Sequence, residues 1–174
     1  MTIGDKIKKL RMLQKQSHKL LDQIYDKRSL KIESVKQAVD FIQTLSPIDK
    51  EVVYVIFMDS KHVIIDIKKI DDGIVNQAVV YPRVVIQEAL NMGAVFVILV
   101  HNHPSGDPQP SNEDIAITKR LFLACFLVDI NLIDSIILGK KRKRFSFFDS
   151  GLINKFTKIF IKMFKRKVNF KRKK

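Results

Sequence analysis

The stretch "VHNHPSGDPQPSNED", residues 100–114, decides how the rest of the chain is interpreted. It places His101 and His103 directly after the apolar run "AVFVILV" and follows them with three prolines and a Ser-x-x-Asp. A loop that only closes a buried strand needs no imidazole. Because alternate residues of an extended chain point the same way, the two imidazoles can converge on one point while Asn102 points away. The stretch therefore predicts a metal site at the end of a strand.

The residues after the prolines bring a third group to the same place. Ser111 is a suitable N-cap for the helix "NEDIAITKRLFLACFLV", whose first turn then holds Asp114 close to the strand end. Two histidines and one carboxylate are the ligands of an open catalytic zinc site, which keeps its fourth position for water. Ser-x-x-Asp alone is a capping box, and an isolated His-x-His is more often a hydrogen-bonded pair. The combination in this order favours the metal.

Outward from this loop, the sequence alternates between strands and helices. The run 94–100 is apolar throughout, which is typical of a strand covered on both faces. The β-branched runs 51–59 and 62–70 predict a hairpin. The other predicted elements are an amphipathic helix over 3–25, a helix from its cap Ser34 to Leu45, a strand over 74–80, a helix from Pro82 to the C-cap Gly93, and closing strands over 130–139 and 144–148. This order predicts an α/β fold with a mixed sheet flanked by helices.

The composition limits the class of protein. With 174 residues, 46% of them hydrophobic, the chain can form one domain with a proper core plus appendages. The single cysteine, Cys125, lies in "LFLACFLV", where it is expected to be a buried hydrophobe, and it excludes an intramolecular disulfide. The longest apolar runs are far shorter than the roughly 20 residues of a membrane span. We expect a soluble, cytoplasmic protein.

The formal net charge of +14 is confined to one end of the chain. Residues 1–139 contain 17 Lys+Arg and 17 Asp+Glu, whereas residues 140–174 contain 15 Lys+Arg and a single acid, Asp149. The body is therefore neutral. An electrostatic partner, if there is one, is expected to bind the C-terminal end.

Residues 152–174 form a basic tail with helical periodicity. One predicted face consists of Leu152, Phe156, Ile159, Phe160 and Met163. The other consists of Lys155, Lys158, Lys162 and Lys165. Such a helix can lie on an anionic membrane surface, bind nucleic acid through its phosphates, or pack its apolar face on its own domain. A solvated tail without a partner is the ordinary alternative, and the sequence does not choose among them.

The stretch "HNHPSGDPQPSNED" resembles the JAMM (MPN+) metalloprotease motif: His-x-His, seven residues, Ser, two residues, Asp. More narrowly, the chain resembles the RadC-like family of bacterial proteins (UPF0758), long labelled DNA repair proteins. The resemblance covers about residues 33–152. The matching segments, in the family's order, are "IFMDSKHVII", "VVYPR", "ILVHNHPSGDPQPS", "DIAITKRL", "IDSIILG" and "FSFFDSG".

This resemblance implies a fold and a site. The fold is a mixed sheet between helices, of the cytidine-deaminase-like type. The site is one zinc ion per chain, held by His101, His103 and Asp114, with Ser111 hydrogen-bonded to the bound water or the oxyanion. The family's general base is a glutamate at the start of the first strand of the domain, a position that Glu51 occupies here. Without the resemblance, Glu51 would be read as an ordinary surface acid.

The chain also departs from the family's pattern. Ser135 follows Asp134 where a histidine is usual, which could weaken activity without removing the metal. Residues 1–32 contain no helix-hairpin-helix module. The predicted organisation is therefore a helical extension over 1–32, a RadC-like JAMM domain over 33–151 and the basic tail over 152–174.

Three functional hypotheses follow. The leading one is a zinc-dependent hydrolase, a metalloprotease of the JAMM type, that cleaves a peptide or isopeptide bond. The second is a non-catalytic accessory protein with a structural metal site, which the basic tail recruits to DNA or RNA. The third is a folded but idle domain. The partners expected are a protein or peptide substrate and, through residues 152–174, a nucleic acid or an anionic membrane surface.

Overall fold

A computed structural model describes residues 34–47, 49–70 and 80–167, together with residues 2, 4, 5, 8, 9 and 12. Within the last helix, side chains are described as far as Phe164. The predicted helix over 3–25 and the predicted strand over 74–80 lie almost entirely outside the described residues. The division into an extension, a domain and a tail stays a prediction.

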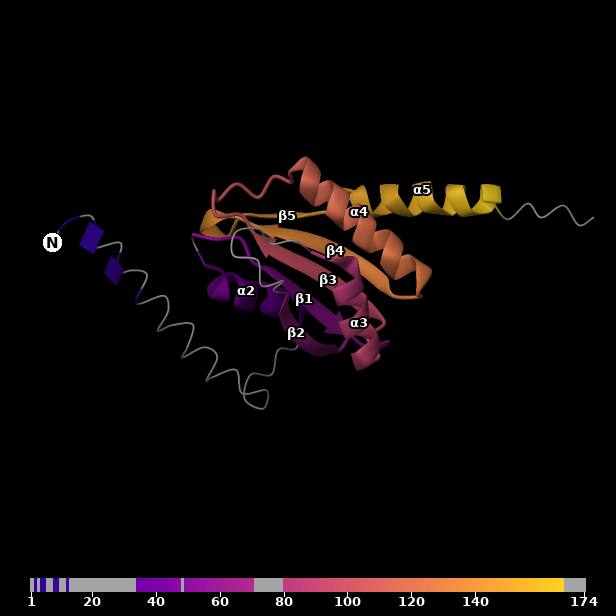
Figure 1. The fold of residues 1–174 in the computed structure, drawn as a ribbon, viewed down its shortest axis with the longest axis horizontal. Helices are drawn as coiled ribbons and strands as arrows, with labels where there is room; N and C mark the ends of the chain where they lie inside the picture. Colours follow the sequence, from indigo (N-terminus) through magenta and orange to yellow (C-terminus); the bar gives the residue numbers. More distant parts are fainter. Residues whose placement is uncertain are drawn as a thin grey trace, which may run out of the picture.

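The centre of the molecule is a five-stranded sheet in the order β2-β1-β3-β4-β5 (Figure 1). The strands are β1 (Val53–Met58), β2 (Ile64–Ile70), β3 (Phe96–Asn102), β4 (Asn131–Leu138) and β5 (Arg144–Ser146). β3 and β4 pair parallel, and the other neighbours pair antiparallel. The predicted mixed sheet and hairpin are confirmed. β3 ends two residues later than predicted, so His101 belongs to the strand and does not follow it.

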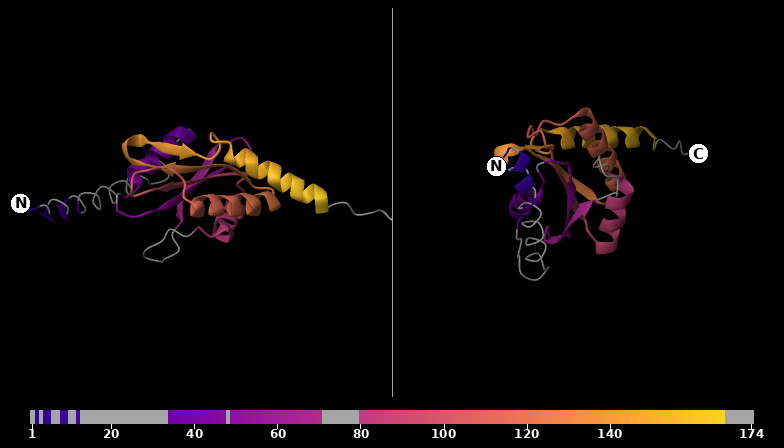
Figure 2. Two further views of the ribbon diagram at one scale, coloured as in Figure 1. Left: turned by 90° about the horizontal axis from the view of Figure 1, so that it is seen from above. Right: turned by 60° about the vertical axis from the view of Figure 1, so that its left-hand side comes forward.

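Helices cover both faces of this sheet. They are α2 (Val35–Leu45), α3 (Pro82–Met92), α4 (Asn112–Leu127) and α5 (Leu152–Lys167), with a short 3-10 turn over Lys140–Arg142. α2 packs on one face, and α3, α4 and α5 contribute to a single core on the other (Figures 1 and 2). The predicted layers are therefore confirmed. None of the helices in the described part of the chain is long and apolar enough to cross a membrane.

The pleat of β1 explains why that strand is apolar throughout. Val55 and Phe57 belong to the core shared with α3, α4 and α5, whereas Ile56 and Met58 belong to the core under α2. Successive side chains of a strand point to opposite faces, so a strand with helices on both sides has no solvent-facing row. β3 follows the same rule, and its odd-numbered positions face α3 and α4.

The local signals at the helix ends are also confirmed. Ser34 Oγ accepts a hydrogen bond from the Gln37 amide at 3.2 Å and caps α2. Pro82 opens α3, and Gly93 ends it with a φ of 65°, the left-handed conformation that favours glycine. Cys125 is fully buried in α4, and burial raises the pKa of its thiol to about 12, which fits the expected role as a small hydrophobe.

The apolar face of α5 packs on the protein's own domain. Ile153, Phe156 and Phe160 are buried, and Phe160 stacks on Phe122 of α4 with ring centroids 5.7 Å apart. One detail of the predicted face is wrong: Met163 is 50% exposed, whereas Ile153, which was not assigned to that face, is buried. Compared with the prediction, α5 is rotated about its axis, so that Phe156 and Phe160 lie at the centre of the face that packs on α4.

We expect Phe160→Ala to lower the free energy of unfolding by about 3–5 kcal/mol, because it leaves a cavity between α4 and α5. Met163→Ala is the matched control on the same helix and is expected to cost less than about 1 kcal/mol, since its side chain is half exposed. Urea unfolding measures both. Equal, small losses would mean that α5 does not belong to the folded core.

Candidate metal centre

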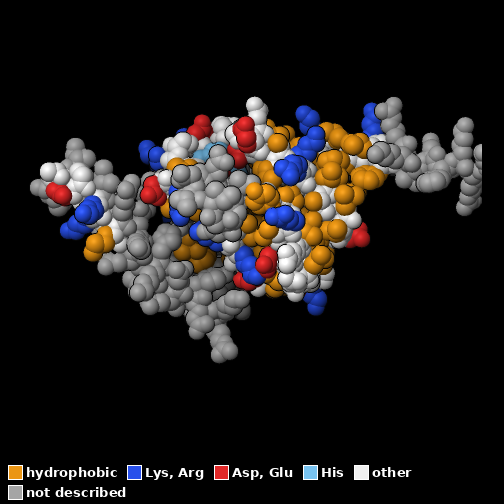
Figure 3. Space-filling model, viewed as in Figure 1, with side chains coloured by type: hydrophobic (Ala, Val, Ile, Leu, Met, Phe, Trp, Pro, Cys, Tyr) orange, Lys and Arg blue, Asp and Glu red, His pale blue; other side chains and the backbone are white. Residues whose placement is uncertain are grey.

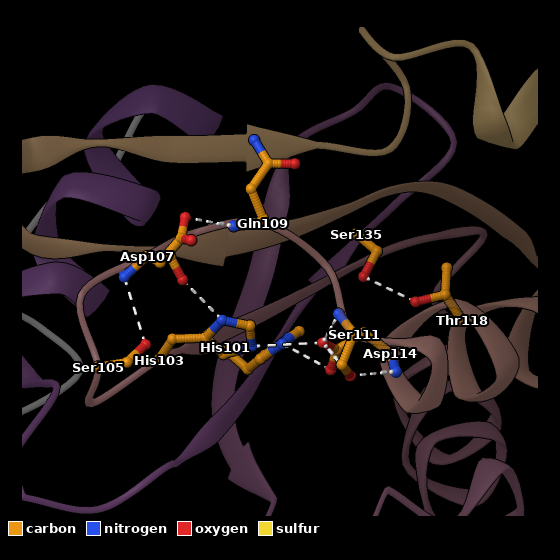
Figure 4. A network of polar contacts seen from close by, with 9 residues as sticks. All are labelled: His101, His103, Ser105, Asp107, Gln109, Ser111, Asp114, Thr118 and Ser135. Carbon is orange, nitrogen blue, oxygen red and sulfur yellow. Dashed lines mark hydrogen bonds and ion pairs between the residues drawn. The ribbon is translucent and has the colours of Figure 1, made fainter.

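Three segments bring the candidate ligands to one end of the sheet. His101 lies in β3 on the face that α3 and α4 cover, and His103 lies just past the strand end. β1 runs antiparallel to β3 with Val53 opposite His101, which places Glu51, two residues before Val53, beside the histidines. Asp114 lies in the first turn of α4 and points back to them (Figure 4).

The four side chains form one cluster. His101 Nε2 lies 3.1 Å from Asp114 Oδ1, and His103 Nε2 lies 3.3 Å from Asp114 Oδ2. With the carboxylate of Glu51 included, the candidate ligand atoms all lie within 4.8 Å of one another. The structure thus brings together the three predicted ligands and the predicted base, and such a cluster can hold a metal ion.

Two observations test whether these residues fit a cation. His101 Nε2 is buried and, although it lies near Asp114, it has no hydrogen-bond partner with acceptable geometry. A buried polar atom without a partner is costly, and a metal would satisfy it. Two ligands about 2.1 Å from a tetrahedral zinc lie about 3.4 Å apart, close to both observed nitrogen–oxygen distances. The donor set therefore fits zinc.

The orientation of His103 is fixed by its own loop. The Asp107 carbonyl oxygen lies 2.8 Å from His103 Nδ1 (Figure 4). Because a carbonyl can only accept, Nδ1 carries the hydrogen, and in the neutral ring Nε2 presents a lone pair to Asp114 and Glu51. Such a backbone contact typically supports a metal-binding histidine.

This loop is held in place by the turn after β4. The His103 amide donates to the Leu138 carbonyl at 2.9 Å, and the Lys140 amide donates to the Gly106 carbonyl at 3.0 Å. The two backbones approach closely at Gly139, where a Cβ atom would lie only 2.6 Å from the Gly106 oxygen. Glycine is therefore required at position 139 for the loop to sit against the turn.

Ser111 and Asp114 cap α4 as predicted. Asp114 Oδ2 accepts hydrogen bonds from the Ser111 amide at 2.7 Å and from Ser111 Oγ at 2.6 Å, and Ser111 Oγ accepts one from the Asp114 amide at 3.0 Å. Burial would raise the pKa of Asp114, but the contacts with His101 and Ser111 outweigh it and hold that pKa below its ordinary value. The carboxylate therefore stays ionised. The role of Ser111 towards a water or an oxyanion stays a prediction.

Glu51 lies at the open edge of the cluster. Its side chain is exposed on one side, but the surrounding protein still desolvates the carboxyl and raises its pKa, an effect that His101 partly opposes. Asp114 and Glu51 thus differ in their environments: one carboxylate is held ionised by hydrogen bonds, and the other is shifted towards neutral pH. Such a difference is typical of a ligand and a base that share one site.

Sequence reasoning missed Asn102, which lies between the two histidines. Its side chain is buried on the α2 face of β3, where Oδ1 accepts from the Val52 amide at 2.8 Å. Nδ2 donates to the Pro47 carbonyl at 2.9 Å and to the Lys50 carbonyl at 3.0 Å. Asn102 therefore fixes the segment that carries Glu51 to the strand that carries His101. The alternation of β3 indicated that Asn102 points away from the histidines, but no sequence pattern indicated these partners.

We expect Asn102→Ala to loosen the segment 47–52 while leaving the metal ligands in place. Val52 loses its amide acceptor, so its hydrogen exchange should accelerate by at least about tenfold, and the free energy of unfolding should fall by about 1–3 kcal/mol. Mass spectrometry follows the hydrogen exchange, and urea unfolding gives the free energy. Zinc content is determined on the same preparation. Asn131→Ala, at an exposed position of β4, is the control. Unchanged protection of Val52 would contradict the role assigned to Asn102.

The unusual Ser135 lies close to the cluster. It is fully buried in β4, and its Oγ accepts a hydrogen bond from Thr118 Oγ1 at 3.1 Å (Figure 4). Thr118 follows Asp114 by one turn of α4. Position 135 therefore contacts the helix that presents Asp114, and its hydroxyl is engaged with that helix.

Comparison with known proteins agrees with this geometry. The model of a family described as "RadC-like JAB domain" matches residues 32–152. The chain belongs to this family. The resemblance of the His-x-His segment to RadC-like proteins is thereby confirmed, and the five-stranded mixed sheet flanked by helices agrees with a JAB/JAMM-type fold.

Several curated relatives carry the same family name. A UPF0758 protein of Clostridium acetobutylicum is 44% identical over 112 residues, which cover 64% of this chain and 49% of that protein. One of Vibrio cholerae is 46% identical over 102 residues, covering 59% and 65%. One of Actinobacillus pleuropneumoniae is 47% identical over 92 residues, covering 53% and 42%. The matched part of the chain thus spans roughly half of these relatives. A RadC-like JAB domain with this cluster fits a JAMM-type hydrolase.

Proposed function

We propose that the protein is a zinc-dependent hydrolase that cleaves a peptide or isopeptide bond. The observation that supports this proposal most is the cluster of Glu51, His101, His103 and Asp114, whose ligand atoms lie within 4.8 Å of one another around a buried nitrogen without a hydrogen-bond partner. Membership of a JAB domain family agrees with it.

Each residue of the site has a distinct task in this proposal. His101, His103 and Asp114 would hold one zinc ion, which would supply Lewis-acid activation of a water molecule and of the scissile carbonyl. Glu51 accepts the proton of the attacking water and delivers it to the leaving amine. The raised pKa of Glu51 makes its carboxylate a stronger proton acceptor than an ordinary glutamate. Ser111 turns its one hydroxyl hydrogen away from Asp114 Oδ2, to which it donates in the structure, and towards the oxygen on which negative charge develops.

The proposal is tested with the full chain on a mixed set of peptides and lysine-linked isopeptides, with products identified by mass spectrometry. Cleavage should disappear after treatment with a chelator and return when zinc is added. His101→Ala should be inactive, whereas His62→Ala, which removes an exposed histidine from the β1–β2 turn, should retain activity. Cleavage that persists in His101→Ala would contradict the proposal, as would a failure of zinc to restore it.

A further inference from the structure

The outward face of α5 is a separate feature of the molecule. Packing on α4 uses Ile153, Phe156 and Phe160, so these side chains are already covered. The opposite side of the helix presents Lys155, Lys158 and Lys162, all exposed. Docking on the domain therefore fixes these three lysines in one outward row.

No acidic residue balances this row within its own segment. Residues 152–174 contain ten Lys+Arg and no Asp or Glu, and the whole excess charge of +14 lies within 140–174. The rest of the chain is neutral and supplies no counter-charge in excess. The outward face of α5 is therefore complementary to a polyanion.

Exposed apolar side chains lie where the C-terminal ends of α4 and α5 meet. Phe126 contacts Phe164 with ring centroids 5.8 Å apart, which joins the C-terminal ends of α4 and α5. Near this junction, five large hydrophobic side chains are at least 40% exposed: Phe126, Leu127 and Val128 at the end of α4, and Ile161 and Met163 on α5. Figure 3 shows hydrophobic side chains gathered over the side of the molecule where α4 and α5 lie, with Lys and Arg side chains among them.

We propose that this surface, comprising Lys155, Lys158, Lys162 and the five exposed apolar side chains, binds the surface of an anionic lipid membrane. An anionic bilayer offers phosphates to the lysines and an apolar layer to the hydrophobic side chains, which fits both halves of the surface. A nucleic acid would satisfy the lysines alone and leave Phe126, Leu127, Ile161 and Met163 without a partner. The combination of charge and exposed apolar area therefore favours the lipid.

The position of this surface is compatible with the proposed hydrolase site. Asp114 lies at the N-terminal end of α4 and Phe126 near its C-terminal end, about 18 Å further along the helix axis. A protein attached through this surface keeps the histidine cluster away from the bilayer and open to a substrate from solution. The inference does not depend on the proposed function, because no residue of the surface belongs to the cluster.

The test is co-sedimentation of the full chain with vesicles of phosphatidylcholine, with and without 30% phosphatidylglycerol. Binding should require the anionic lipid. Reversing Lys155, Lys158 and Lys162 to Glu should weaken vesicle binding by about 100-fold or more. Each lysine near an anionic surface contributes roughly tenfold or less to the affinity, and replacing it by Glu changes the charge by two units instead of one. Lys36→Glu, Lys61→Glu and Lys143→Glu together make the same change in net charge at exposed positions outside α4 and α5, and this control should bind several-fold more tightly than the first variant.

A second variant separates the lipid from a nucleic acid. Ile161→Asn with Met163→Asn keeps every charge and changes only exposed side chains, so the protein should fold, and its vesicle binding should fall by about tenfold. Binding of duplex DNA at the same salt concentration is measured in parallel. The inference is overturned if the protein ignores anionic vesicles, if both lysine variants lose binding equally, or if DNA is bound more tightly and the Asn variant is unaffected in both assays.

Discussion

Asp114→Ala is expected to weaken zinc binding by more than about 100-fold. No other single substitution outside the histidines should lower the zinc affinity as much. Loss of a residue that only supports a ligand costs 10–100-fold in metal affinity, so loss of a ligand itself should cost more. The Asp114 carboxylate faces the Nε2 atoms of both histidines, at 3.1 and 3.3 Å, so its removal opens one whole side of the cluster. Equilibrium dialysis against a zinc buffer measures the affinity directly.

The same substitution also removes a helix cap, which a second variant separates from metal binding. Asp114→Asn keeps an oxygen that can accept from the Ser111 amide and hydroxyl, but it removes the negative charge. It should fold as the wild type does and still bind zinc weakly. Asp40→Ala removes an exposed carboxylate from α2, away from the cluster, and should leave zinc affinity within about twofold. Wild-type affinity in Asp114→Asn and Asp114→Ala would remove Asp114 from the ligand set.

Glu51→Gln is expected to keep zinc and to lose turnover by about 10²–10⁴-fold. The amide has nearly the shape of the carboxyl but cannot accept the proton of the attacking water, and general base catalysis contributes roughly this factor. The ligands from β3 and α4 are unchanged, so zinc content should stay near that of the wild type. Turnover and metal content are measured on the same preparation, with any cleaved substrate found in the mixed peptide and isopeptide set.

The control for this substitution is Glu113→Gln, which neutralises an exposed acid in the first turn of α4 beside Asp114. It changes the net charge equally and should leave turnover within about twofold. If Glu51→Gln turns over substrate as fast as Glu113→Gln does, Glu51 is not the base. A loss of zinc in Glu51→Gln would instead place Glu51 among the ligands, a position that its distance from the other three side chains permits.

The parts of the site that could be predicted are those set by local geometry. The period of a strand brings His101 and His103 to the same side, and the capping box brings Asp114 back to the strand end; both are properties of neighbouring residues. Glu51 is different. Glu51 comes close to the histidines only because the antiparallel register sets Val53 opposite His101, which lies 48 positions further along the chain. No local pattern indicates this register, and only the resemblance to a known family indicated a role for Glu51.

The parts that could not be predicted depend on tertiary contacts. Asn102 was placed correctly on the face away from the histidines, but its partners lie in the segment between α2 and β1, which no periodicity connects to β3. The period of α5 identified an amphipathic helix but left its partner open. In the structure that partner is α4. Phe160 stacks on Phe122, and in this orientation of α5 Ile153 is buried and Met163 is exposed.

Elemental analysis of the purified 174-residue chain for zinc shows whether His101, His103 and Asp114 form a metal centre. We expect about one zinc per chain, removed by a chelator, restored by dialysis against zinc, and lost in Asp114→Ala. A folded chain that holds no zinc after such reconstitution would rule out the metal site, and the cluster of His101, His103 and Asp114 would then be a polar contact between β3 and α4 without a metal.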